Sequence, residues 1–461
     1  MKNSWVYPLT MACYVLIKRI FFGQPSRLNR THSLTLIFLL GLWPVVVCSQ
    51  AALSLNELTQ RAIEQNKDLR AARYTVAIAT ARLVQAGLWP NPSLNLSNND
   101  DRLFNDEGEY SRSAGFSQAF PISGRIAKQK TVARLDVLKA IAEIREAERQ
   151  LSSKVANAFY AAVITERRLH QLNYLLQINH ELVDVIHNRY HAAEISKLDD
   201  NSARIEYLRI VQEKHLLHSL RISQYATLNQ LMGRAANSPL SLKSDIITGN
   251  KLPELARLKA LALKNRPDRQ AIVLSIHRAN ADRRLARAER FADWTLGLGV
   301  QQDKIVVEEG PRQPADRTLG ITLSVPLPLL NRNQGRILEA SHTGTQAIMA
   351  LRALDLSIAT EVTSNYKQLN ALRMSLKETQ QVSLKLGVDN VKLARESYEN
   401  GQISLLNVLQ IQKQQNDLQM TYLNTLEKYL QVYVALCTAI GPGTTQGLCP
   451  YLVYQRNGDD K

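Results

Sequence analysis

Three sequence patterns that commonly identify enzymes are missing from this 461-residue chain. It contains no Gly-x-x-x-x-Gly-Lys-Ser/Thr phosphate-binding loop, no Cys-x-x-Cys pair and no residue arrangement typical of a hydrolase triad. These absences argue against a nucleotide hydrolase, a thiol oxidoreductase and a nucleophilic hydrolase. The residues alone therefore predict neither an enzyme of these three classes nor a cofactor.

Cysteine is scarce, with four residues in the chain, and only Cys437 and Cys449 lie in its C-terminal part. A stretch rich in glycine separates them. Two interpretations stay open: a disulfide formed in an oxidising compartment, or two unpaired thiols.

Long hydrophobic runs are missing beyond residue 47, and the run from Leu34 to Val47 is interrupted by Pro44. This run is too short for a comfortable transmembrane helix. Basic residues precede it and a small-x-small sequence ending at Ala51 follows it, as in the signal peptide of an exported protein. We expect residues 1–51 to be a signal peptide cleaved near Ala51, with lipid attachment at Cys48 as an alternative.

Acidic residues are fewer than basic ones. The chain has 41 Asp and Glu and 57 Lys and Arg, which gives a formal net charge of +16. Residues 1–51 hold five Lys and Arg and no Asp or Glu, so their removal lowers the net charge to +11. The remaining basic residues alternate with acidic ones, as in IREAERQ. This mixture is typical of solvated helix faces and of attraction to anionic lipid, and it argues against nucleic acid as a partner.

What the sequence does contain is an internal repeat of about 200 residues. The segment RYHAAEISKL at 189–198 returns as SYENGQISLL at 397–406, an offset of 208. Pro121 has its counterpart in Pro326 at an offset of 205. We therefore predict a tandem duplication, with repeats at 52–232 and 253–441, a linker at 233–252 and a tail at 442–461.

Each repeat has the same predicted order: an opening helix, two strands, a very long helix, a tight turn and a return helix. The helices and strands of the first repeat are expected at 55–86, 93–101, 113–120, 125–191 and 197–232. Those of the second are expected at 253–290, 294–303, 318–325, 334–399 and 405–440. Each very long helix spans roughly 100 Å, about the summed length of the two shorter ones, which predicts that it lies beside a stacked pair.

The predicted strands alternate apolar residues with small or polar ones, for example at Leu319, Ile321 and Leu323. This alternation over about ten residues is typical of a membrane-spanning sheet, although a soluble hairpin shows it too. Four strands cannot close a barrel, and an open sheet edge is unstable in lipid. The sequence therefore predicts a mixed α/β, mostly α membrane protein whose chains must oligomerise. Three copies would give twelve strands, and the family resemblance described next implies this homotrimer, with a 12-stranded β-barrel and a barrel of long helical hairpins.

Three segments carry a resemblance to a known family: AGLWPNPSLNLS at 86–97, SQAFPISGRI at 117–126 and VPLPLLNRNQGRI at 325–337. With the duplication and the turn motifs, they resemble the TolC-like outer membrane efflux proteins, specifically the cobalt–zinc–cadmium branch that serves heavy-metal RND pumps. The resemblance implies an outer membrane channel with a large periplasmic portion, which conducts divalent metal cations passively. It also implies three partners: a periplasmic membrane-fusion adaptor, an inner membrane RND pump and outer membrane lipid.

The resemblance assigns roles to residues at and beyond the two turns. It makes the turns adaptor-contacting tips, formed by Tyr190, Ala193, Glu194, Ile195, Ser196 and Leu198 and by Tyr398, Gly401, Gln402, Ile403, Ser404 and Leu406. Ala193 stands where glycine is expected, so we expect the first tip to turn differently. The expected pore constriction is formed by Asp199, Asp200, Asn407 and Gln410. The two aspartates would equally suit a solvated helix start.

Residue types predict further features at the strand ends and on the first hairpin. Hinges between strand and long helix are expected at Pro121, Gly124, Pro326, Pro328 and Gly335, with an asparagine capping the second long helix. Membrane-interface aromatics are expected at Trp89, Phe291 and Trp294. The four-residue spacing of His187 and His191 suits a weak metal pair, but histidines without a ligand role also occur at this spacing.

Two other functions stay open. A drug or type I secretion channel would have the same fold and the same sequence periodicities. A periplasmic coiled-coil scaffold without a pore would account for the long helices but not for the alternating strands.

Overall fold

The computed structural model describes residues 52–103, 107–243, 252–307, 310–311, 313–442 and 449. The predicted signal peptide, with Cys48 and Ala51, lies outside the described residues, as do part of the predicted linker and most of the predicted tail. Within the described part the chain is mostly helical with four antiparallel strands, which confirms the predicted fold class.

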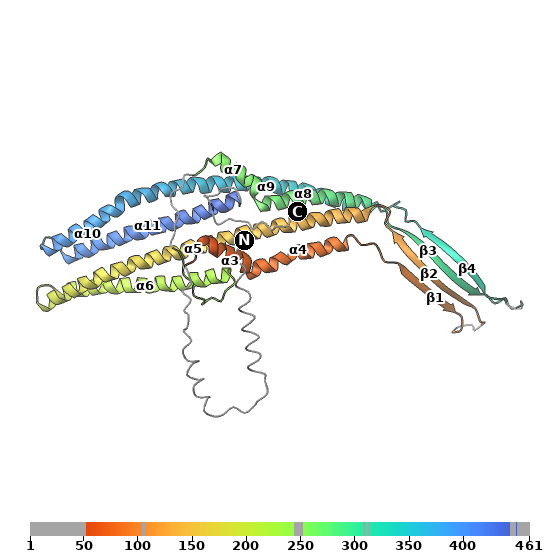
Figure 1. Ribbon diagram of the computed structural model, residues 1–461, viewed down its shortest axis with the longest axis horizontal. Coiled ribbons are helices and arrows are strands. Elements are labelled where there is room, and N and C mark those ends of the chain that lie inside the picture. The colour runs from red at the N-terminus through yellow and green to blue at the C-terminus, as the bar shows by residue number, and fades with distance from the viewer. Residues whose placement is uncertain are drawn as a thin grey trace, which may run out of the picture. The chain divides into compact units, whose positions relative to one another are not determined.

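The two repeats contain the same succession of helices (Figure 1). The first repeat has α3 (Leu55–Gln65), α4 (Lys67–Gln85), α5 (Arg125–His191) and α6 (Lys197–Leu231). The second has α7 (Leu255–Asn265), α8 (Pro267–Ala288), α9 (Gln334–Glu378), the π-helical segment η1 (Thr379–Ser383), α10 (Leu384–Glu399) and α11 (Leu405–Ile440). None of the helices in the described ranges is both long enough and apolar enough to cross a bilayer.

Each opening helix is broken in two, whereas one continuous helix was predicted. The first break lies at Asn66, whose side chain accepts a hydrogen bond from the Leu69 N–H at 2.9 Å and so caps α4. The second lies at Arg266, and Pro267 is the first residue of α8. Proline has no N–H with which to continue α7 and disfavours a helical conformation in the residue before it.

The second long helix is also interrupted, contrary to the prediction. It turns π-helical over Thr379–Ser383, whereas α5 runs without a break for 67 residues. A π-helical turn changes which side chains share a helix face. The segment contains neither proline nor glycine, so no residue type in it predicts the interruption.

The helices lie side by side in the same order as the strands that they adjoin. Near the strands, α4 contacts α5, α5 contacts α8 and α8 contacts α9 (Figure 1). Towards the turns, α6 contacts α5 in place of α4, and α11 contacts α5 and α9 in place of α8. Each very long helix therefore lies beside stacked shorter helices, as the helix lengths predicted.

The main core lies where the stacked helices meet. Buried side chains of α3, α7, α9, the middle of α5 and the end of α11 pack together there. Phe159, Ile358 and Leu430 are each at most 1% exposed. Since none of the described strand residues joins this cluster, the apolar side chains of the sheet are not stabilised by the core of the same chain.

The four strands form one sheet in chain order: β1 (Ser93–Asp100), β2 (Tyr110–Phe120), β3 (Trp294–Lys304) and β4 (Asp316–Ser324). The β2–β3 pair joins the two repeats. β2 ends opposite Trp294 and β4 ends opposite Thr295, so Pro121 and Pro326 follow strands that end at the same edge of the sheet. This placement agrees with the predicted duplication.

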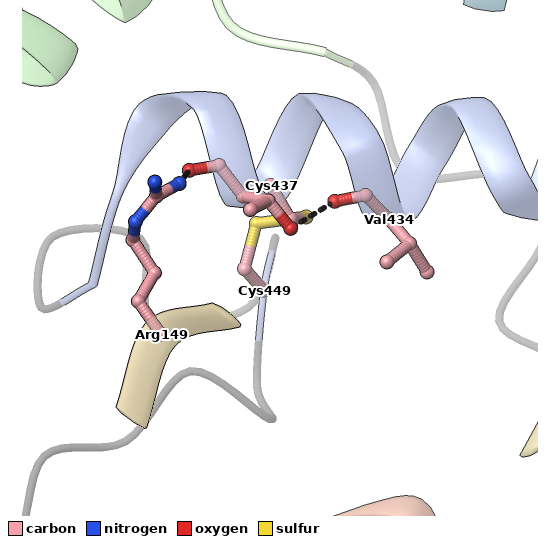
Figure 2. Close-up of a disulfide and its surroundings, with 5 residues drawn as sticks. Arg149, Val434, Cys437 and Cys449 are labelled. Carbon is pink, nitrogen blue, oxygen red and sulfur yellow. Dashed lines mark hydrogen bonds between the residues drawn. A yellow bond between two sulfur atoms is a disulfide. The ribbon is translucent and has the colours of Figure 1, made fainter. Parts of the chain in front are cut away.

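Cys437 and Cys449 form a disulfide, so the first of the two interpretations of these residues is the one observed (Figure 2). Cys437 lies in the last turns of α11, and both residues are buried. Beside the bond, the Arg149 guanidinium of α5 donates to the Thr438 carbonyl oxygen, and the Thr438 hydroxyl donates to the Val434 carbonyl oxygen at 2.7 Å. The disulfide thus ties residue 449 to the end of α11 at the main core.

We predict that neither cysteine of this pair reacts with a maleimide in the denatured, unreduced protein, and that both react after reduction. Peptide mass spectrometry measures this directly. Replacing Cys449 with serine opens a 12-residue loop and should lower the local stability at the end of α11 by about 3 kcal/mol, because the unfolded chain gains freedom. Faster amide hydrogen exchange near Cys437 is the expected readout. Labelling of either cysteine before reduction would contradict the assignment.

Candidate functional site

The sheet has two chemically different faces. One cross-strand row contains Leu94, Phe116, Leu298 and Ile321, and the next contains Leu96, Ala114, Val300 and Leu319. The large apolar residues in these rows are between 52% and 72% exposed. A contiguous exposed apolar face of this size indicates a surface that meets lipid or another protein.

The opposite face carries small and polar side chains. Its rows contain Ser93, Ser117, Gly297 and Thr322, and then Asn95, Gly115, Gly299 and Gly320. A Cβ on Gly299 would come within 3.1 Å of the Gly115 Cα, so the two strands approach closely there because neither residue has a side chain. This face suits contact with water.

The joint between sheet and helices is held by an ion pair that spans the repeats. Arg125, the first residue of α5, donates from Nε and Nη2 to the two carboxylate oxygens of Asp293, at 2.8 and 2.5 Å. Both side chains are largely buried, at 25% and 16% exposed. The hydrogen bonds from Arg125 hold the pKa of Asp293 below its ordinary value. Such a bidentate pair fixes direction as well as distance.

An equivalent arginine holds the second joint. Arg336 follows Gly335 as Arg125 follows Gly124, and its Nη2 donates to both carboxylate oxygens of Asp282 at 2.7 and 2.8 Å. The sequence prediction named the two glycines and missed the arginines. The signal was present, because the Gly-Arg-Ile triplet occurs in both hinge segments.

The two hinges have their left-handed residues at different positions of the repeat. Gly124 precedes α5 with φ of 65°, but the residue that precedes α9 with φ of 57° is Asn333, and Gly335 lies in the first turn of α9. Asn333 does not cap α9 with its side chain, which instead donates to the Ala286 carbonyl oxygen of α8 at 2.8 Å. Pro326 and Pro328 line a shallow pocket beside this residue.

The predicted tips are the two turns between long helix and return helix. Ala193 and Gly401 both have left-handed backbones, with φ of 60° and 71°. Equivalent hydrogen bonds close both turns, from Glu194 N–H to the Arg189 carbonyl oxygen at 2.9 Å and from Gln402 N–H to the Ser397 carbonyl oxygen at 2.8 Å. The expectation that alanine makes the first tip turn differently is therefore wrong.

Side chains at the two tips pack against each other and leave other side chains exposed. Ile186, Ala203 and Leu405 form a small buried cluster, against which Ile195 and Tyr398 pack. The residues that point outwards include Glu194, Gln402, Ser196, Ser404, Leu198 and Leu406. Leu198 is 73% exposed and Leu406 68% exposed, so both tips present an apolar side chain that a protein partner could cover.

The four predicted constriction residues do not share one environment. Asn407 and Gln410 are exposed, and Asp199 is half-buried at the start of α6, where its N–H donates to the Ser196 hydroxyl at 3.2 Å. Asp200 is only 4% exposed and its carboxylate faces His187. Burial of Asp200 between α5 and α6 does not fit an open position in a pore, so we remove it from the predicted constriction.

The predicted interface aromatics lie where the strands begin. Trp89 is 60% exposed and meets Phe120 edge to face, with ring centroids 6.2 Å apart. Phe291 and Trp294 are 50% and 39% exposed. His187 and His191, the predicted metal pair, lie together in the last turns of α5.

The sequence is similar to a known family along most of its length. The sequence model described as outer membrane efflux protein matches residues 58–234 and 258–442, one range in each repeat. The chain is 24% identical to the cobalt-zinc-cadmium resistance protein CzcC of Cupriavidus metallidurans, over 85% of this chain and 89% of that protein. It is 27% identical to the pyoverdine export outer membrane protein OpmQ of Pseudomonas aeruginosa, over 84% of this chain and 85% of that protein.

Among solved structures the fold matches that of CusC, whose crystal structures concern folding and transmembrane channel formation. The TM-score is 0.70 at 19% identity, and the match covers 84% of this chain and 92% of that one.

We predict opposite effects of exchanging the two tip residues. Gly401→Ala should destabilise the second tip by about 1 kcal/mol, because a Cβ would meet nothing within 4 Å and only the left-handed backbone is strained. Ala193→Gly should stabilise the first tip by a similar amount. Amide hydrogen exchange at each turn measures the two local free energies. Effects of the same sign would contradict the equivalence of the turns.

We also predict that Asp293→Asn weakens the joint by about 1.5–3 kcal/mol, because the Arg125 guanidinium loses its charged partner. The matched control is Asp136→Asn, which removes the more exposed Arg278–Asp136 pair and should cost less than about 1 kcal/mol. Because the pKa of Asp293 is lowered in the folded protein, its contribution is complete above the unfolded pKa of about 3.9 and is lost as pH falls further. Hydrogen exchange at the start of β3 should therefore distinguish wild type from Asp293→Asn at pH 6, and the difference should shrink progressively as the pH falls below about 3.9.

Proposed function

The chain belongs to the outer membrane efflux protein family, and from this membership we propose that it is the exit channel through which a tripartite pump expels divalent metal cations. As a member of this family it is an outer membrane efflux channel, with a periplasmic extension of long helices, and it catalyses no reaction. The substrate, the trimer and the partner proteins are the proposed part.

We propose that three copies of the chain close one channel. β1 and β4 are the end strands of the sheet, so each leaves one row of backbone N–H and C=O groups for a neighbour. Twelve strands would then form a barrel with the apolar rows towards lipid and the small polar rows towards the lumen. The helices on the two open sides carry unpaired apolar residues that the neighbouring copies would cover: Tyr74 and Ile78 of α4, Ile205 and Leu208 of α6, and Met349 and Leu356 of α9.

In this proposed arrangement the two tips would lie farthest from the membrane along the helices. We propose that the exposed side chains of the tips, Leu198 and Leu406 above all, contact a periplasmic adaptor linked to an inner membrane RND pump. Beyond the tips, Asp199, Asn407 and Gln410 remain the proposed constriction. One acidic side chain per copy would give the trimer a ring of three, which attracts cations.

The observation that carries the proposal of divalent metal as the substrate is the similarity to CzcC, which extends over 85% of the chain. The resemblance of the hinge segments to the cobalt–zinc–cadmium branch supports it. A second candidate is an organic anion or drug-like substrate. It is favoured by the 27% identity to a protein named for pyoverdine export.

Growth assays separate the two candidates. The gene would be expressed with its adaptor and pump in a host deleted for its own outer membrane efflux channels. We expect tolerance to cobalt, zinc or cadmium to rise at least fourfold over a host that carries the adaptor and pump alone, because the pump then has an exit. Minimal inhibitory concentrations measure the effect, with dyes, drugs and a siderophore tested alongside.

A loss-of-contact variant, Leu198→Asp with Leu406→Asp, tests the role of the tips. It changes exposed side chains only and should leave the protein folded in the outer membrane. It should lose the metal tolerance because the tips no longer fit an apolar partner surface. Tolerance restored to organic compounds but not to metals would refute the metal proposal and support the second candidate.

A further inference from the structure

Three polar side chains meet at the first tip in an arrangement that the channel function does not require. His187 Nε2 and His191 Nε2 lie 3.1 Å apart, and His187 Nδ1 lies 3.1 Å from Asp200 Oδ1. The His187 side chain is 46% exposed and His191 is exposed, whereas the Asp200 side chain is 6% exposed. Two accessible histidines therefore stand in front of a buried carboxylate.

The duplication provides an internal comparison for these three positions. At the offset of 208 that relates the tips, His187, His191 and Asp200 correspond to Arg395, Glu399 and Val408. Val408 is 1% exposed, so the packing at this position suits an apolar side chain. Burial of a carboxylate there costs free energy unless a donor compensates it.

The donors around Asp200 are few. His187 is the near one, and the Arg204 guanidinium reaches the second oxygen only at 4.0 Å. A carboxylate that accepts from Nδ1–H of a histidine fixes the tautomer in which Nε2 carries the lone pair. Asp200 thus presents the Nε2 of His187 as an electron-pair donor towards His191.

The distance between the two Nε2 atoms suits a shared cation. Zinc binds imidazole nitrogen at about 2.0–2.1 Å, so two nitrogens on a tetrahedral ion are about 3.3 Å apart. The observed 3.1 Å is close to this separation, and the two accessible rings, which meet edge to face with centroids 4.5 Å apart, would rotate to aim both lone pairs at one ion. No group of three or more His, Cys, Asp or Glu side chains able to hold a metal occurs in the described part of the chain, so the remaining positions would be filled by water.

We propose that His187 and His191 bind a divalent cation of borderline softness, such as zinc, cobalt or cadmium, with Asp200 as the residue that positions His187. The site is present in the first repeat only and therefore three times in the proposed trimer. With two protein ligands it releases its ion quickly, as a site on an export route must. Its biological role rests on the proposed metal channel, but the binding itself is a property of these three residues.

Zinc titration of the purified, detergent-solubilised full chain tests the site. The protein should carry an affinity tag without histidine, because a polyhistidine tag binds zinc itself. We expect one zinc per chain by calorimetry, and cobalt should give the visible absorption of a nitrogen-ligated ion. His187→Gln with His191→Gln should abolish this binding event, since glutamine keeps the size and polarity of the side chain but is a poor ligand.

Two further variants separate ligation from positioning. Asp200→Asn should keep the stoichiometry and weaken zinc binding about 10- to 100-fold, the loss typical of a missing partner behind a ligating histidine. His215→Ala with His218→Ala, a histidine pair on α6 in which His218 accepts a hydrogen bond from Arg221, is the matched control and should leave binding unchanged. Circular dichroism and size-exclusion chromatography check that each variant folds and assembles.

Zinc binding that is unchanged in His187→Gln/His191→Gln would overturn the site, and an unchanged affinity in Asp200→Asn would overturn the role of Asp200. These measurements need neither pump nor adaptor. Failure of the binding proposal is therefore distinguishable from failure of the metal tolerance assay.

Discussion

The edges of a four-stranded sheet that crosses a membrane are the constraint on which the rest of the structure depends. Lipid offers no hydrogen bonds, so every unpaired N–H and C=O at an edge costs several kcal/mol there. β1 and β4 each have one strand neighbour in the chain. Because the helices follow the same order as the strands, a neighbouring copy that pairs with an edge strand also covers the open side of the helices. In the proposed trimer, the same contact between neighbouring copies would therefore close the sheet and pack the helices.

The joint between sheet and helices transmits this constraint. Strands pack about 4.8 Å apart and helices 8–10 Å apart, so the chain must fan out as it passes from one to the other. Left-handed residues at Gly124 and Asn333 allow the change of direction. The Arg125–Asp293 pair then holds the first turn of α5 against the second repeat, and the Arg336–Asp282 pair holds the first turn of α9 against α8.

The periodic parts of the fold could be predicted from the sequence because local pattern determines them. Local sequence signals are enough to predict the alternating strands, the uninterrupted α5 and the two turns. These signals are the hydrophobic periodicity and the residues that end each element, and neither depends on tertiary contacts. The departures had other causes. Asn66 breaks a helix through a side-chain cap that tertiary packing selects, and η1 has no local signal. Burial of Asp200 depends on which face of α6 meets α5. The sequence does not determine this face, because α6 is only weakly amphipathic.

Differences between the repeats are more informative than their similarities. A duplicated chain can keep two equivalent hairpins, and the two tips are equivalent in backbone even though one has alanine where the other has glycine. Both turns have the same left-handed backbone and the same closing hydrogen bonds, so the hydrogen bonds rather than the residue type determine the turn. The exchange of a buried valine for Asp200 has no such structural benefit, because an apolar side chain already fits that position in the other repeat. Packing at this position does not require a carboxylate, so we relate Asp200 and its histidine partner to the proposed cation site rather than to folding.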